Sequence, residues 1–238
     1  TDYVGSTKVA TVQKSTATFT PSASSTYSIA ANVGYKPVSA SFDSASIYFN
    51  NDGVLHIITG ARGTFVLNAE VGEIPTIEFT MLGIYNAPTD TAAPATTYTN
   101  QATPLIFKAG NTTAFSILGY SGCLMSLELD MANETVYREL VGCDKSVLIT
   151  NRAVEGTCMI EAPTIAQKDF FTVANDDTTG ILTMLHGTTA GNRVTLLAPK
   201  VDIGNPSYED SDGIQMLSLP FAAIPTSAGN DEVSLTFA

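Results

Sequence analysis

The side chains that could carry out catalysis or bind a metal are few and scattered in this sequence. His56 and His186 each lie within an apolar run, without a histidine four residues away, a cysteine or a carboxylate pair beside them. General acid–base catalysis and zinc binding both need such convergent partners. We therefore interpret both histidines as structural.

One acidic segment, residues 208–213 (YEDSDG), superficially resembles a calcium-binding loop. Such a loop ends in a glutamate that binds the ion through both oxygens, and Leu219 stands at that position. We therefore predict a polar turn. Residues 119–122 (GYSG) do not match the G-x-S-x-G turn of hydrolases, and the chain has neither a P-loop nor a GxGxxG motif. We assign no catalytic, cofactor-binding or metal-binding residue and expect no cofactor.

The three cysteines, Cys123, Cys143 and Cys158, are odd in number and have no CxxC spacing. A disulfide framework favours an even number in a smaller chain. We therefore expect reduced thiols in a cytosolic setting, packed as small apolar side chains.

The charge balance limits the classes of partner. The chain has 11 basic and 23 acidic residues, a net charge of −12, and its basic residues form no run. Proteins that bind nucleic acid or anionic membranes need clustered Lys and Arg. No stretch reaches the roughly 18 apolar residues of a membrane span, and no signal peptide is visible. Apolar residues make up 44%, enough for a sizeable core.

Short alternating runs separated by turn residues predict an antiparallel β protein. Residues 44–49 and 54–59 flank an Asp52-Gly53 pair, which is typical of a tight hairpin turn. In the strand predicted over residues 74–83, Thr76, Glu78 and Thr80 share one face, opposite an apolar face. Further strands are predicted over residues 63–71, 115–131, 146–162, 181–186, 192–203, 214–222 and 232–237.

Two segments break this pattern. Residues 86–104 are rich in Pro, Thr and Ala, which predicts an extended connector. It could serve either as an arm that reaches another subunit or as a surface loop. Residues 163–174 begin with a proline and place apolar side chains at helical spacing, which predicts one α-helix.

A weak internal repeat suggests two related units. Residues 63–72 are similar to residues 195–204, with Glu70 matched to Asp202 at a separation of 132 positions (202 minus 70). Residues 76–84 are similar to residues 216–224. We therefore predict a first unit with its connector over residues 1–104 and a second unit over residues 105–238. The first unit is too short for the same set of strands and the chain opens with Thr1, so we expect an N-terminal portion to be missing.

From residue 46 onward the sequence resembles the major tail tube proteins of long-tailed, non-contractile (siphovirus-type) bacteriophages, whereas the first 45 residues match poorly. The segments that carry the resemblance occur in order along the chain. They are 47–56 (IYFNNDGVLH), 60–65 (GARGTF), 72–75 (GEIP), 79–85 (FTMLGIY), 87–90 (APTD), 146–152 (SVLITNR), 160–163 (IEAP), 168–171 (KDFF), 186–192 (HGTTAGN), 204–208 (GNPSY) and 229–232 (GNDE).

The resemblance implies a non-enzymatic virion protein with a tail-tube fold: a β-sandwich or half-barrel flanked by one α-helix. Its copies would form stacked rings around a channel through which DNA passes without specific binding. Its partners would be itself, the tape-measure protein and the tail-end proteins, assembled in the host cytoplasm. A single unit per chain implies a hexamer, and two repeated units imply a trimer with pseudo-sixfold symmetry.

An acidic channel wall would repel phosphate groups and let DNA slide. The candidates for positions that face the channel are Glu70, Glu73, Thr76, Glu78, Thr80 and Asp202. The alternative is that these residues coat an outer solvent face. Competing functions are a secreted bacterial adhesin or pilin module, a phage capsid or decoration protein and, more remotely, a carbohydrate-active enzyme.

Overall fold

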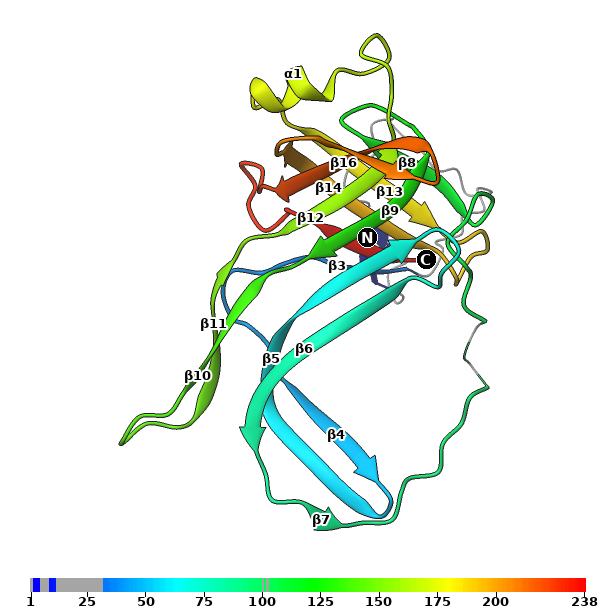
Figure 1. The fold of residues 1–238 in the computed structure, drawn as a ribbon. Helices are drawn as coiled ribbons and strands as arrows, with labels where there is room; N and C mark the ends of the chain where they lie inside the picture. The colour runs from blue at the N-terminus through cyan, green and yellow to red at the C-terminus, as the bar shows by residue number, and fades with distance from the viewer. Residues whose placement is uncertain (1, 5–8, 12–31, 100, 102) are drawn as a thin grey trace. The chain divides into compact units, whose positions relative to one another are not determined.

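The computed structural model describes residues 2–4, 9–11, 32–99, 101 and 103–238, and most of them lie in β-strands (Figure 1). The chain divides into two compact units, residues 1–30 and 31–238. In the first unit, Asp2–Val4 (β1) and Val9–Thr11 (β2) pair antiparallel. The missing N-terminal portion expected from the sequence lies outside the described residues.

In the second unit, thirteen of the described strands form one antiparallel sheet. They are Val33–Tyr35 (β3), Ala45–Asn51 (β4), Val54–Glu70 (β5), Thr76–Tyr85 (β6), Thr89–Asp90 (β7), Thr112–Ile117 (β8), Leu124–Asp130 (β9), Glu155–Glu161 (β12), Gly180–His186 (β13), Val194–Ile203 (β14), Ser207–Ser211 (β15), Ile214–Ala223 (β16) and Ser234–Phe237 (β17). Asn133–Arg138 (β10) and Ser146–Arg152 (β11) form a separate two-stranded hairpin that projects from this sheet (Figure 1). The fold is mainly β, as predicted, and is consistent with a β-sandwich.

The hairpin predicted at Asp52-Gly53 is confirmed. Both residues have positive φ, 45° and 87°, as a tight two-residue turn between β4 and β5 requires. The two strands predicted over residues 54–59 and 63–71 are, however, a single strand, β5. Gly60 adopts a φ of 59°, and the register shifts between Thr59 and Arg62, so a bulge bends the strand instead of ending it.

Strands β15 and β10 are among those that were not predicted as such. Residues 208–213, interpreted as a polar turn, include most of β15, which pairs with β16 through a turn at Asp212 and Gly213. Strand β10 lies in a stretch for which no element was predicted. Both strands are short, and each pairs with the strand that follows it in the chain, β10 with β11 and β15 with β16.

The helix is shorter than predicted. Residues 163–174 were expected to be helical, but α1 is Phe170–Asn175. The Asp169 side chain accepts a hydrogen bond from the Thr172 amide at 2.9 Å and caps the helix there. This hydrogen bond also holds the pKa of Asp169 below its usual value. No helix in the described part of the chain is both long and apolar enough to cross a membrane.

One apolar core underlies the sheet and includes side chains from both halves of the chain. Leu67 of β5, Leu129 of β9 and Leu219 of β16 are among its buried members, and Phe170 fixes α1 to it. Strands β5 and β9 pair directly, so the sheet runs without interruption across residue 104. The division into two repeated tube units at that residue stays a prediction.

The connector over residues 86–104 is largely irregular among its described residues. Only β7 forms a strand there, and it pairs with Val54 and Leu55 at the start of β5. The N-terminal part of the connector is therefore paired with the tip of the β4–β5 hairpin (Figure 1).

The environment of the cysteines gives a testable prediction. Cys158 is buried, and loss of hydration raises the pKa of its thiol to about 12, whereas Cys123 and Cys143 are exposed. At pH 8 a thiol reagent should modify two thiols quickly in the folded protein and the third only in denaturant, because the reactive form is the thiolate. Rapid reaction of three thiols in the folded protein would contradict this packing.

Candidate functional site

The pairing register places several acidic residues on the face of the sheet that lies opposite the core. Residues that face each other on paired antiparallel strands project their side chains to the same side. Glu78 of β6 faces Val66 of β5, and Val66 in turn faces Asp130 of β9. The buried Leu67 and Leu129 belong to the other side.

The same row continues across the sheet. Asp130 faces Glu155 of β12, Glu155 faces Ala222 of β16, and Ala222 faces Asp202 of β14. Glu78, Asp130, Glu155 and Asp202 therefore form one line across six strands. With strands about 4.8 Å apart, this line is about 24 Å long. We call these four residues the acidic row.

Other polar side chains extend this surface. Next to the acidic row, Thr76 of β6 faces Asn68 of β5, and Asn68 faces Glu128 of β9. An open cavity of about 640 Å³ is lined by Glu128, by three members of the acidic row and by Asp177, which follows α1. The result is a polar surface on which carboxylates predominate.

The six candidates from the sequence fall into two groups. Five of them share this face: Thr76, Glu78 and Thr80 on β6, Glu70 on β5 and Asp202 on β14. Glu73 lies instead in the turn between β5 and β6, where its amide donates a hydrogen bond to the Glu70 carbonyl.

Sequence reasoning missed Glu128, Asp130 and Glu155, which lie between the predicted residues. A signal for the first two was present, since Leu127, Glu128, Leu129 and Asp130 alternate apolar with acidic side chains. Glu155 had no such signal, because it opens its strand.

The acidic row brings like charges together. Asp130 and Glu155 lie directly opposite each other on neighbouring strands, an arrangement that destabilises a sheet when both are charged. The negative charge of Asp130 is partly compensated, because its carboxylate accepts hydrogen bonds from the Ala132 amide at 2.7 Å and the Thr64 hydroxyl at 3.4 Å. One oxygen of Asp202, Oδ1, is buried and has no hydrogen-bond partner in the described protein.

The histidines lie apart from this face. His186 is buried, and its ring nitrogens lie 3.0 Å from the Thr112 hydroxyl and 3.2 Å from the Leu105 carbonyl, so its ring is held in the core. His56 is exposed on β5 beside Phe49. Within the described residues, no group of three or more His, Cys, Asp or Glu side chains is arranged to hold a metal ion.

The sheet also has open edges. Strand β6 pairs only with β5, and β8 pairs only with β13, among the described strands. Large apolar side chains are exposed near the β5–β6 end, including Phe79 and Tyr85 on β6 and Tyr48 and Phe49 on β4. Unpaired strand edges and exposed apolar side chains together are typical of a surface that binds another protein.

Neutralising one member of the opposed pair should stabilise the isolated subunit. For Glu155→Gln we expect a gain of roughly 0.2–1 kcal/mol in the free energy of unfolding at low salt, because repulsion from Asp130 is removed. The gain should shrink at high salt, where charges are screened. Urea denaturation measures it, with Glu209→Gln as control, because Glu209 faces Met216. An equal gain in both variants, or none in Glu155→Gln, would contradict the pairing.

A comparison with protein families matches the chain to a known group. A family model described as "Phage tail tube protein" matches residues 5–237. The match includes most of the first 45 residues, which carry none of the segments that resemble siphovirus-type tail tube proteins. A comparison with curated proteins found no match. The chain therefore belongs to the phage tail tube protein family and is a structural subunit of a phage tail.

Proposed function

We propose that copies of this chain close into rings that stack into a tail tube, with the acidic row lining the channel. The observation that carries the proposal is the row itself, in which Glu78, Asp130, Glu155 and Asp202 cross six strands on the face opposite the core. Nothing in this function requires a catalytic residue or a cofactor.

The charge of this face suits a DNA channel. Nucleic acid binds proteins chiefly where Lys and Arg neutralise phosphates and release counterions. A surface rich in carboxylates, with Thr76 and Thr80 beside it, has the opposite effect and repels phosphate. DNA would therefore pass along the channel without specific binding. Glu70 and Glu73, near the end of β5, would extend the acidic surface.

The open edges support ring closure. An unpaired strand edge binds other strands readily, and proteins normally cover it. In a ring, the edge of β6 would be completed by a strand of the neighbouring copy, so that the channel wall becomes a continuous sheet.

The number of copies in a ring depends on whether the chain contains two repeated tube units or one. If residues 1–104 and 105–238 are two tube units, three copies give a ring with pseudo-sixfold symmetry. If the chain is a single unit, six copies are needed. We favour the trimer because of the similarity between residues 63–72 and 195–204, which lie mostly in β5 and β14.

The remaining partners follow from a siphovirus-type tail. The tape-measure protein would occupy the channel while the tube assembles in the host cytoplasm, and tail-end proteins would close it. DNA would then replace the tape-measure protein during ejection.

Electron microscopy of concentrated protein tests the tube. We expect hollow rods or stacked rings with a central channel, and their rotational symmetry decides between three and six copies. Solid fibres without a channel, or dispersed monomers at every concentration, would contradict the proposal.

We call the side of the sheet that carries the acidic row and Glu128 the acidic face. Reversing its charge tests which side of the sheet faces the channel. The variant Glu78→Lys/Glu128→Lys/Glu155→Lys should form tubes that bind duplex DNA at low salt and protect it from nuclease. The binding should weaken steeply between about 50 and 200 mM salt, as phosphate contacts do. Nuclease protection is the decisive readout, because DNA inside the channel is shielded.

The matched control is Asp43→Lys/Asp90→Lys/Glu134→Lys, which makes the same change in net charge at exposed positions outside the acidic face. Its tubes should leave DNA open to nuclease. If DNA bound by the first variant is also digested, the acidic face lies on the outside of the tube.

A further inference from the structure

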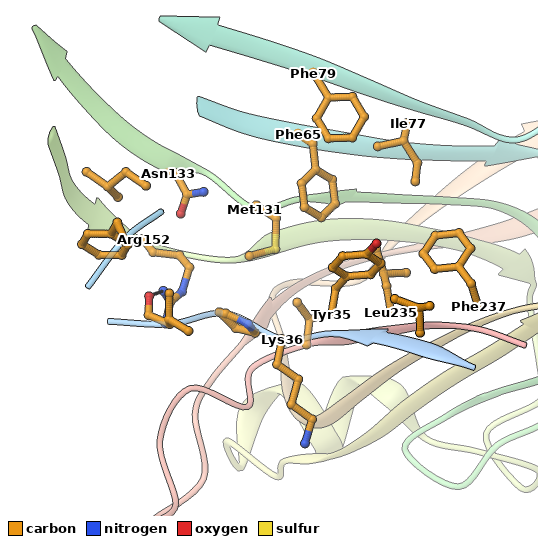
Figure 2. Close-up of a pocket in the computed structure, with 16 residues that line it drawn as sticks. Tyr35, Lys36, Phe65, Ile77, Phe79, Met131, Asn133, Arg152, Leu235 and Phe237 are labelled. Carbon is orange, nitrogen blue, oxygen red and sulfur yellow. Dashed lines mark hydrogen bonds between the residues drawn. The ribbon is translucent and has the colours of Figure 1, made fainter. Parts of the chain in front are cut away.

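An apolar groove of about 680 Å³ opens on the side of β5 and β6 that faces away from the acidic row. Figure 2 shows Phe65, Ile77 and Phe79 on one side of it and Tyr35, Leu235 and Phe237 on the other. Phe79 is 67% exposed and Tyr35 is 60% exposed. The groove therefore offers a large apolar surface that this chain leaves uncovered among its described residues.

Two arginines hold the wall of the groove in place. The Arg152 guanidinium donates hydrogen bonds to the Val38 carbonyl and to Glu232, both at 2.7 Å, and the Arg152–Glu232 pair is largely buried. Arg62 donates to the Phe42 carbonyl at 2.7 Å. Residues 38–42, which contribute to the lining, are thus fixed before any ligand arrives. A preformed groove costs less conformational entropy to fill.

The tip of the β10–β11 hairpin carries a matching apolar group. Val141 is fully exposed, and its neighbour Leu140 is 57% exposed. The base of the same hairpin borders the groove through Asn133 and Arg152, which face each other. From Asn133 to Arg138 the strand extends about 17 Å away from that base. The tip therefore cannot fold back into the groove of its own chain.

Each surface carries one charge that suits an ion pair across the contact, Lys36 in the groove and Asp144 at the tip. The groove lining includes no carboxylate, and its other cation, Arg152, is already paired with Glu232. Lys36 lies at the rim, with its ammonium group directed away from the apolar side chains (Figure 2). Asp144 lies at the hairpin tip, and within the described part of the chain neither Lys36 nor Asp144 forms an ion pair.

We propose that Leu140 and Val141 of one copy insert into the groove of a second copy, with Asp144 placed near Lys36. The inference rests on the proposed self-assembly and names the contact that carries part of it. The tip and the groove are different surfaces, so the contact is heterologous. Each copy then has one free tip and one free groove, which lets the assembly continue from copy to copy.

A mixing experiment tests this contact. Val141→Lys replaces the apolar side chain at the hairpin tip and leaves the groove intact. Phe79→Asp places a charge in the groove and leaves the hairpin tip intact. In analytical ultracentrifugation each variant alone should associate only at higher concentrations than the unmodified protein does. The mixture should form a 1:1 dimer, because one intact tip meets one intact groove. Ile165→Lys is the control at another exposed apolar position, 56% exposed and outside both surfaces, and should associate normally.

A charge exchange supplies a second test that does not touch the apolar side chains. Lys36→Glu should weaken association several-fold, since it would face Asp144 of the neighbour. Adding Asp144→Lys to the same chain should restore it. Thermal denaturation of each monomer checks that the variants remain folded. Failure of the double variant to recover would count against the proposed contact.

The outcomes separate this inference from the proposed tube. Tubes formed by Val141→Lys as readily as by the unmodified protein would overturn the groove contact and leave the tube proposal standing. Loss of assembly in Phe79→Asp alone would overturn the contact as well, and would point to a different segment of the second copy in the groove. A 1:1 dimer from the mixed variants, without hollow tubes from the unmodified protein, would support the contact and contradict the tube.

Discussion

The structure depends on one constraint of the antiparallel sheet: alternate side chains of a strand point to opposite sides, so each strand gives only half of them to the core. Strands β5, β9, β12 and β16 share one register in which Leu67, Leu129 and Leu219 are buried together. The same register aligns Asp130 with Glu155 on the other side. Burying a single leucine contributes about 1.5–3 kcal/mol, whereas opposed like charges cost at most about 1 kcal/mol. The core therefore outweighs the repulsion.

The charged face and the apolar surfaces serve different requirements of a tube subunit. Repulsion along the acidic row depends on several carboxylates acting over a distance, so no single residue is essential to it. Association with other copies needs the opposite: apolar side chains and open strand edges at defined places. The chain separates the two, with the acidic row on one side of β6 and Phe79 on the other.

A subunit with exposed aromatic side chains and unpaired edges is adapted to assembly, and this has a cost. Such surfaces favour unintended aggregation in an isolated protein. The high net negative charge offsets the tendency, because copies that carry −12 repel one another at long range. Contacts that bury Phe79 or Val141 must overcome this repulsion. Association therefore depends on how closely the apolar surfaces of two copies fit together.

The sequence by itself determined the β class, the hairpin at Asp52-Gly53 and the wet face of Thr76, Glu78 and Thr80, because turn chemistry and side-chain alternation are local. Only the tertiary structure decided that Glu78 and Asp202 belong to one row, and that Asp130 and Glu155 lie between them. It also decided that α1 begins at Phe170, where Asp169 caps it. Alternation identifies which residues share a face of one strand, but which strands become neighbours is set by packing between residues far apart in the chain.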